Sequence, residues 1–390
     1  MSEPFFAQCP RGLAGVLATE LAALGAVDCV GGEAGVAFAG DWAVAYRANL
    51  ESRIATRILW RVAEFDYRDE HDIYDATFLL PWSAWFLPER TLKVEISAHR
   101  APVQSLDFTT LKVKDAICDK FREVCGKRPS IARREPDIRV HAHLEATRAA
   151  LYLDLSGEAL FKRGRRDETG VAPLKKNLAA GIIALSGWRP DDAFLDPMCG
   201  SGTFLVEAAE IALGIAPGLS GGAQRPFALE RLLTFDARLW SDTLAAARAR
   251  AAPVRALALF GSDLYGDVLK QARENLAANG ILDAVQLKQA NVVEISAPAP
   301  SGVWVTNPPY GERLGDAEAL ARLYPALGDV LKKKFTGWRA YFFTSDFTLA
   351  KAIRLSASKR TPLYNGKIEC RLFEYKIVAG TNRAGPPTDG

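Results

Sequence analysis

From about residue 170, short apolar runs alternate with segments whose apolar residues recur at helical spacing. Five runs have the length and composition of buried strands: 193–196, 257–260, 285–290, 303–306 and 340–344. The segments around them predict four helices: 174–185, 203–213, 267–278 and 317–335. Strands that alternate with helices are typical of a parallel sheet covered on both faces, so we expect a doubly wound α/β domain.

Two features interrupt or end this pattern. Residues 215–255 break the alternation, and we expect an additional helical insertion there. The sequence Tyr364-Asn365-Gly366-Lys367 joins two extended runs, and Asn-Gly favours a tight hairpin turn. We therefore expect the sheet to end in an antiparallel hairpin. The Gly- and Pro-rich residues 381–390 are expected to form a disordered tail.

In the first 160 residues, strands and helices mix without regular alternation. Residues 92–98 and 138–144 alternate apolar and polar positions, as strands with one buried face do. Between them, residues 109–124 carry apolar residues at helical spacing. We expect two α+β parts here, a small one over 1–60 and a second one over 61–160.

Composition limits the class of protein. The chain has 390 residues, 49% hydrophobic and 24% charged, with a net charge of +3, which is typical of a soluble globular protein with two or three domains. The six cysteines form no CxxC pair and no Cys/His cluster, so we expect a reduced, cytoplasmic chain without a metal. The first residues lack the basic and apolar pattern of a signal peptide, and the chain has no apolar run of about 20 residues, so we expect neither a signal peptide nor a membrane partner.

The first strand of the α/β region runs into the loop Asp196-Pro-Met-Cys-Gly-Ser-Gly-Thr203. Ligands of open α/β sheets bind beyond the carboxyl ends of the strands, and Gly200 and Gly202 let the backbone turn tightly beside a ligand. A phosphate loop would need lysine where Thr203 stands, and a dinucleotide loop of the form GxGxxG would need a third glycine, which this loop lacks. We therefore expect an adenosyl cofactor, although the loop alone is also compatible with a turn that binds no ligand.

Two more polar residues stand at strand ends. Asp263 lies 67 residues after Asp196, and a carboxylate at this position can accept hydrogen bonds from both ribose hydroxyls of an adenosine. Asn291 follows the third strand, where its side-chain amide could read adenine. The alternative for Asp263 is a helix cap, and the alternative for Asn291 is a turn.

The fourth strand ends in Asn307-Pro308-Pro309-Tyr310. An exocyclic amine is a poor nucleophile because its lone pair is delocalised into the ring. The side-chain oxygen of Asn307 and the carbonyl of Pro308 can accept its two N–H bonds, and this holds the nitrogen near tetrahedral geometry, facing a methyl group on sulfur. Pro309 stiffens the loop, and Tyr310 offers a flat face for stacking a base. Taken alone, such a tetrapeptide is also a common strand-terminating turn.

Three longer stretches accompany these two loops: Asn-Pro-Pro-Tyr-Gly-Glu-Arg-Leu-Gly at 307–315, Ala-Pro-Leu-Lys-Lys-Asn-Leu-Ala-Ala at 172–180, and Ser-Leu-Asp-Phe-Thr-Thr-Leu-Lys-Val-Lys-Asp-Ala-Ile at 105–117. Together with the loop at 196–203 they resemble the THUMP-domain RNA methyltransferases, a class I group that depends on S-adenosylmethionine. The resemblance covers nearly the whole chain and is in particular to the 23S ribosomal RNA guanine-N2 methyltransferases.

This resemblance implies a ferredoxin-like part over 1–60, a THUMP RNA-binding domain over 61–160, and a Rossmann-like, seven-stranded class I methyltransferase domain over 165–380. The catalytic residues it implies are Asn307, Pro308, Pro309 and Tyr310. Those implied to contact S-adenosylmethionine are Pro173, Leu174, Asn177, Asp196, Pro197, Cys199, Gly200, Ser201, Gly202, Thr203, Asp263, Leu264, Asn291, Val292 and Asn307. Many relatives have Asp where Asn291 stands. Some carry a second methyltransferase domain, so with one domain we expect a single modification.

Basic residues gather in two stretches. Nine lie between Leu111 and Arg139, and four more lie between Lys162 and Arg166. Such patches bind RNA phosphates even when net charge is small, although a single Lys or Arg is more often a solvated surface residue. The candidates for RNA contact are Lys112, Lys114, Arg128, Arg133, Arg134, Arg163, Arg165 and Arg166.

The leading hypothesis is methyl transfer from S-adenosylmethionine to guanine N2 in structured RNA, namely 23S ribosomal RNA or a large-subunit assembly intermediate. The first alternative keeps the chemistry and changes the acceptor to a transfer RNA guanine or to adenine N6. The THUMP-like half argues against DNA as the acceptor. The second alternative is a non-catalytic RNA-binding protein with a methyltransferase fold, against which the complete loop 307–310 argues.

Overall fold

The computed structural model describes residues 2–164, 174–222, 225–308 and 317–378. The chain divides into two compact units. Unit 1 comprises residues 1–163, 216–219 and 223–250, and unit 2 comprises residues 164–215, 220–222 and 251–390. Within the described ranges, every helix is too short or too polar to cross a lipid bilayer.

Unit 1 is built on one seven-stranded sheet, and both expected α+β parts contribute to it. Its strands, in spatial order, are β2 (Val27–Gly31), β3 (Gly35–Gly40), β1 (Glu3–Gln8), β4 (Arg57–Asp66), β7 (Arg148–Asp154), β6 (Ile138–Leu144) and β5 (Leu92–Ala98). Strand β4 pairs with β1 on one side and with β7 on the other, so it joins the two parts. Only β5 and β6 pair in parallel among these described strands.

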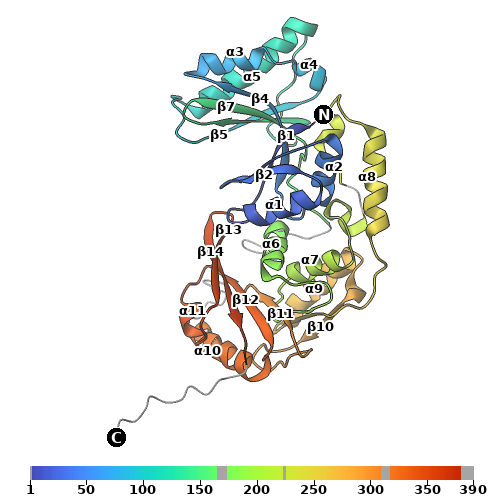
Figure 1. Cartoon of the computed structure of the whole chain (residues 1–390), viewed down its shortest axis with the longest axis vertical. Helices are drawn as coiled ribbons and strands as arrows, with labels where there is room; N and C mark the ends of the chain where they lie inside the picture. The colour runs from blue at the N-terminus through green and yellow to red at the C-terminus, as the bar shows by residue number, and fades with distance from the viewer. Residues whose placement is uncertain (1, 165–173, 223–224, 309–316, 379–390) are drawn as a thin grey trace. The chain divides into compact units, whose positions relative to one another are not determined.

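The helices of unit 1 are α1 (Ala14–Ala23), α2 (Trp42–Glu51), α3 (Glu70–Phe78), α4 (Trp82–Trp85), α5 (Leu106–Cys125) and α8 (Ala237–Arg250). Helix α5 begins where the Ser105 side chain accepts the N–H of Phe108, and it ends at Gly126, whose φ is 71°. Its apolar residues Val113 and Phe121 are buried. Figure 1 shows α3 and α5 together over one face of the sheet.

Helix α8 lies within the insertion that interrupts the strand–helix alternation, and it packs in unit 1 against α2. The rings of Tyr46 and Trp240 lie 5.6 Å apart in an edge-to-face arrangement, and the Tyr46 hydroxyl accepts the backbone N–H of Asp236. The periodicity predicted a helical insertion, and it is present. Its packing against residues almost two hundred positions earlier could not be read from the local pattern.

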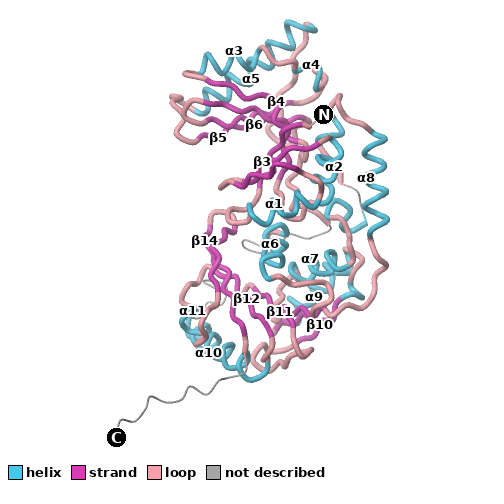
Figure 2. Tube along the Cα trace, viewed as in Figure 1, coloured by secondary structure: helices cyan, strands magenta, loops and turns pink. Residues whose placement is uncertain are grey.

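Unit 2 contains the expected doubly wound sheet. Its strands, in spatial order, are β10 (Val285–Gln289), β9 (Leu259–Asp263), β8 (Ala193–Asp196), β11 (Gly302–Thr306), β12 (Trp338–Thr344), β14 (Ile368–Lys376) and β13 (Lys359–Asn365). The first five are parallel, and β14 runs antiparallel to β12 and β13, so the expected antiparallel hairpin is confirmed. Figure 2 traces β10, β11, β12 and β14 across this sheet.

The helices of unit 2 are α6 (Lys176–Ser186), α7 (Thr203–Ala212), α9 (Gly266–Ala278), α10 (Ala317–Lys334) and α11 (Leu349–Ala352). Helix α7 packs on β8 and β9, whereas Leu327 and Leu331 of α10 share a core with Trp304 and Phe342. Along the chain, strand order proceeds outward from β8 to β10 and then restarts at β11 on the other side. The switch point therefore lies between β8 and β11, where open α/β sheets bind ligands.

Candidate functional site: a pocket at the strand ends of unit 2

The loop from β8 to α7 turns sharply because two of its glycines adopt left-handed backbone conformations. Gly200 has a φ of 53° and Gly202, the N-cap of α7, has a φ of 79°. The loop is tied to the end of β9, since the N–H of Cys199 donates to the carbonyl of Ser262 over 2.9 Å. This arrangement fixes the direction of the loop backbone beside the switch point.

The Asp263 side chain is held in place by two backbone groups. Its Oδ2 accepts the N–H of Gly200 over 3.0 Å, and its Oδ1 accepts the N–H of Tyr265 over 3.2 Å. A carboxylate oxygen has more than one acceptor position, so both oxygens retain capacity for a ligand. Asp263 therefore bonds to the local backbone, as expected if it were a cap, and its carboxylate also borders a pocket.

A pocket of about 420 Å³ opens at these strand ends. Seven of the residues expected to contact the cofactor line it: Pro197, Gly200, Asp263, Leu264, Asn291, Val292 and Asn307. The sequence analysis missed four further lining residues: Met198, Tyr265, Val268 and Leu323. Met198 and Tyr265 are next in sequence to predicted residues, so their neighbours could have indicated that they line the pocket. Leu323 lies on α10, and nothing in its local sequence links it to this pocket.

The other described residues that were expected to contact the cofactor do not line the pocket: Leu174, Asn177, Asp196, Cys199, Ser201, Gly202 and Thr203. Leu174 and Asn177 are buried at the start of α6, and Cys199 is buried within the loop. Gly202 and Thr203 begin α7. Pro173 lies outside the described residues, so its expected contact stays a prediction.

Asp196 lies buried beneath the pocket and links two neighbouring strand ends. Its Oδ1 accepts the hydroxyl of Thr306 over 3.0 Å and the N–H of Met198 over 3.3 Å. Burial raises the pKa of Asp196 to about 7, and repulsion from Asp263 acts in the same direction, while the two hydrogen bonds oppose the shift. Asp196 therefore titrates near neutral pH and holds the loop to β11.

Asn307 follows β11 directly and faces the pocket from the opposite side of the switch point. Its Oδ1 is buried and accepts no hydrogen bond within the part of the chain that the structure describes. Because an unpartnered buried acceptor is costly, it points to a donor that is supplied by a ligand. Pro309 and Tyr310 lie outside the described residues, so their expected roles stay predictions.

The pocket fits the parts of the expected cofactor, S-adenosylmethionine. The fixed carboxylate of Asp263 suits the ribose diol, and the apolar side chains of Leu264, Val268 and Val292 suit an adenine ring. Asn291 adds an amide whose Oδ1 already accepts the N–H of Val293, which leaves its NH₂ group for a ligand acceptor. In the described residues, no group of three or more His, Cys, Asp or Glu side chains could hold a metal ion.

Six of the eight expected RNA-contacting residues lie in unit 1. Arg128, Arg133 and Arg134 are exposed, whereas Lys112 lies over the rings of Tyr74 and Phe108, with its Nζ 5.7 and 5.3 Å from their centroids.

The other four expected RNA contacts differ from these. Lys114 forms an ion pair with Asp115. Arg163 is only 4% exposed and donates to the carbonyl of Arg53, so its position is that of a buried structural residue. Arg165 and Arg166 lie outside the described residues.

Three family descriptions match successive parts of the sequence. Residues 4–59 match an RlmL ferredoxin-like domain, residues 67–154 match a THUMP domain, and residues 163–374 match an RMKL-like methyltransferase domain. These matches agree with the resemblance inferred from the motifs.

Similar proteins carry related names. The ribosomal RNA large subunit methyltransferase K/L of Aeromonas hydrophila is 40% identical over 96% of this chain and 54% of its own length. The chain thus spans about half the length of the curated relatives it first matches. By contrast, slr0064 of Synechocystis, which bears an RNA methyltransferase name, is 38% identical over 96% of this chain and 97% of its own.

Solved structures share the fold over nearly the whole chain. SMU.472, crystallised with SAH, has a TM-score of 0.86 and 30% identity, and the match covers 97% of this chain and 99% of that one. A Listeria monocytogenes protein named for adenine-N6 DNA methylation has the same TM-score and identity, over 97% of each chain. Given the family matches and the cofactor-sized pocket at the switch point, the chain belongs to the RMKL-like methyltransferase family and carries a THUMP domain.

Proposed function

We propose that this protein transfers a methyl group from S-adenosylmethionine to the exocyclic N2 of a guanine in 23S ribosomal RNA. The observation that carries the proposal is the buried, unpartnered Oδ1 of Asn307 beside the cofactor pocket. The RNA acceptor is supported by the THUMP match and by the names of the ribosomal relatives. Cytoplasmic 23S RNA, or an assembly intermediate that contains it, is the proposed partner.

Different residues of the pocket contact different parts of the cofactor. Asp263 accepts hydrogen bonds from the ribose hydroxyls, and Leu264 and Val292 hold the adenine between apolar surfaces. The turn at Gly200 brings backbone close to the methionine part. When bound, S-adenosylmethionine supplies an electrophilic methyl group on a sulfonium.

Asn307 prepares the acceptor nitrogen. Its Oδ1 accepts one N–H of the guanine amine, and the carbonyl of Pro308 accepts the other, so the nitrogen lone pair turns toward the methyl group. The methyl group moves from sulfur to nitrogen, and the nitrogen then loses one proton to solvent. Catalysis rests on orientation and on hydrogen bonds that strengthen as the nitrogen becomes tetrahedral. Pro309 and Tyr310 are proposed to stiffen the loop and to stack on the extruded base.

Adenine N6 is a second candidate acceptor, because one structural relative is named for that reaction and Asn307 would orient either amine in the same way. A transfer RNA guanine is a third, since the residues of the pocket do not distinguish one RNA from another. A non-catalytic RNA-binding role would leave the buried Asn307 oxygen without a reason.

Radiolabelled S-adenosylmethionine distinguishes these cases when undermodified 23S RNA, transfer RNA, duplex DNA and protein are offered in parallel. We expect label in N2-methylguanosine after digestion of the 23S RNA. Label in N6-methyladenine or in transfer RNA would keep the chemistry and replace the acceptor. If the protein binds cofactor but labels none of these acceptors, the proposed function is wrong.

A further inference from the structure

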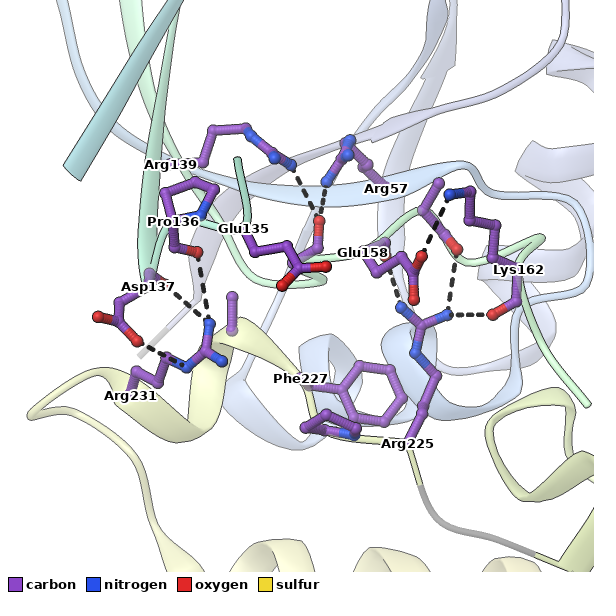
Figure 3. A pocket seen from close by; sticks show the side chains of 14 residues that line it. Arg57, Glu135, Pro136, Asp137, Arg139, Glu158, Lys162, Arg225, Phe227 and Arg231 are labelled. Atoms are coloured by element: carbon purple, nitrogen blue, oxygen red, sulfur yellow. Dashed lines mark hydrogen bonds and ion pairs between the residues drawn. The ribbon is translucent and has the colours of Figure 1, made fainter. Parts of the chain in front are cut away.

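Unit 1 contains a second pocket, of about 470 Å³ (Figure 3). Four separate segments line it: Arg57 at the start of β4, residues 135–139 before and within β6, residues 157–162, and residues 225–231 of the insertion. Its lining holds five cationic side chains and three carboxylates, so positive charge is in excess.

At the base of this pocket, two arginines share one carboxylate. Arg57 and Arg139 both donate to the buried carboxylate of Asp154 and to the carbonyl of Gly157. In Figure 3 the dashed lines from the two guanidinium groups meet at one oxygen. Asp154 can balance only one of the two charges. Glu95 lies 3.5 Å from the Nε of Arg139 but also pairs with Lys93, so it does not remove the excess.

Arg225 forms the wall of the pocket and has no carboxylate partner among the described residues. Its guanidinium donates to the backbone carbonyls of Glu158, Ala159 and Lys162, and it lies over the ring of Phe227 at 5.2 Å. These partners fix its position without neutralising its charge. Burial lowers the pKa of Arg225, and repulsion from Arg57 adds to this effect, although Glu158 opposes it.

The rim is more exposed and carries the remaining cations. Lys162 has 49% of its side chain exposed and lies 3.2 Å from Glu158, and Arg231 has 36% exposed and lies 3.4 Å from Asp137. Exposed pairs of this kind are weak and exchange readily for a stronger anion. Arg231 also donates to the backbone carbonyls of Pro136 and Asp137. The least constrained cation of the pocket is therefore Lys162, which has one exposed ion pair.

We propose that this pocket binds a phosphate group of the RNA substrate, an inference that rests on the proposed function. Planar guanidinium groups match phosphate oxygens, and three of them here are already oriented by other bonds. The volume suits a nucleotide rather than a bare ion. The phosphate is either an internal phosphodiester or a terminal phosphomonoester of the RNA chain, and the two share this chemistry.

A substitution at Ala159 tests the pocket without removing any arginine contact. Ala159 lines the pocket, and Arg225 bonds to its backbone carbonyl, which the substitution keeps. Ala159→Glu places a carboxylate among the guanidinium groups, and Ala159→Gln adds the same bulk without charge. We expect Ala159→Glu to raise the Kd for 23S RNA about tenfold more than Ala159→Gln does. It should also reduce the salt dependence of binding by about one unit of log–log slope.

Thermal denaturation separates binding from folding in this pair. Ala159→Glu should be at least as stable as the parent protein, because the new carboxylate meets unbalanced positive charge. Calorimetry with S-adenosylhomocysteine should give the same affinity for both variants. Equal RNA affinity and equal salt slope for the Glu and Gln variants would overturn the proposal.

A second pair tests the rim. Lys162→Ala should weaken RNA binding about threefold and lower the salt slope. Arg148→Ala is the control, since Arg148 is an exposed cation of unit 1 that also pairs with a glutamate and lies outside both basic stretches. If the two variants bind RNA alike, the rim assignment is wrong.

The source of the phosphate is distinguished with 23S RNA fragments that carry or lack a 5′ phosphate. A difference between Ala159→Glu and Ala159→Gln that disappears with dephosphorylated RNA identifies a terminal phosphate, and one that persists identifies an internal one. The proposed function fails separately, by absence of label in the methyl-transfer panel. The pocket fails if RNA is methylated but the Ala159 pair is indistinguishable.

Discussion

At the scale of single residues, Asn307 is the side chain on which the proposed chemistry depends most. Its buried Oδ1 has no described partner, so we expect Asn307→Ala to lower kcat for methyl transfer at least ~100-fold, as removal of an oriented hydrogen-bonding group does. Affinity for S-adenosylhomocysteine and for RNA should change little. Single-turnover transfer and calorimetry measure the two effects.

Asn291→Ala is the matched control, because Asn291 lines the same pocket on the cofactor side. It should raise the KM for S-adenosylmethionine and leave kcat nearly unchanged. If the Asn307 variant also loses cofactor affinity and keeps its kcat, then Asn307 is a binding residue and its role as the orienting group is wrong.

Asp196 gives a prediction about pH. Burial raises its pKa in the folded protein to about 7 from an ordinary value of 3.8, so the folded state binds this proton more tightly than the unfolded chain does. The corresponding stability is therefore present below about pH 4 and is lost as pH rises toward 7, by up to about 4 kcal/mol. Asp196→Asn removes the titration and can keep both hydrogen bonds of the Asp196 oxygen.

The melting temperature of Asp196→Asn should therefore exceed that of the parent protein at pH 8, and the difference should shrink toward pH 5. Thermal denaturation across this range measures the effect. Parallel curves for the two proteins would mean that Asp196 is not protonated near neutral pH in the folded state.

At the scale of elements, the turn between β8 and α7 must be both left-handed and closely packed. A Cβ at Gly202 would lie 3.3 Å from the Cβ of Ala272, and the φ of Gly202 is 79°. We expect Gly202→Ala to cost about 1 kcal/mol or more of stability and to weaken cofactor binding, because the loop backbone that meets Asp263 shifts. Calorimetry with S-adenosylhomocysteine measures the second effect.

Gly280→Ala is the control for Gly202→Ala. Gly280 has a similar φ of 70° after α9, but a Cβ there would meet no atom within 4 Å. It should lose comparable stability through backbone strain and keep its cofactor affinity. Equal losses of affinity in both variants would assign the effect to general destabilisation.

The central elements of unit 2 could be predicted from the sequence because β8, β9, β11 and β12 are short, largely apolar runs that are buried along most of their length. The carboxyl ends of β8, β9 and β11 also carried recognisable polar residues, so Asp263 and Asn307 could be placed together. Leu323 could not be predicted as a pocket residue, since it belongs to an amphipathic helix whose sequence looks like any core-packing helix. Contacts at the second pocket, such as that of Arg57 with Asp154, join residues that are 97 positions apart, which no local pattern reveals.

At the scale of the whole molecule, the chain enters unit 2, returns to unit 1 for residues 223–250, and then completes unit 2. The helical content of that return was predictable from periodicity, but its destination was not, because an amphipathic helix does not specify the surface that buries it. Domain limits near residues 60 and 160 stay predictions, although the sheet of unit 1 is continuous through β4.

Because residues 223–250 belong to unit 1, we can predict with which unit they unfold. Trp240 lies within the methyltransferase match in sequence, yet its buried ring packs on Tyr46 and Phe227 in unit 1. We expect calorimetry to resolve two unfolding transitions. S-adenosylhomocysteine should raise the midpoint temperature of only one of them, the transition of unit 2. Trp240→Ala should lower the other transition, at a cost of about 3–5 kcal/mol.

Trp304→Ala is the counterpart in unit 2. Trp304 is a fully buried residue of β11 that shares a core with Leu331 of α10 and with Phe335. This variant should lower the transition that S-adenosylhomocysteine raises. Cooperative unfolding follows the surfaces that bury a residue and not its position in the sequence, so Trp240→Ala should leave that transition unchanged. If Trp240→Ala lowers it instead, residues 223–250 unfold with the cofactor-binding unit and the prediction is wrong.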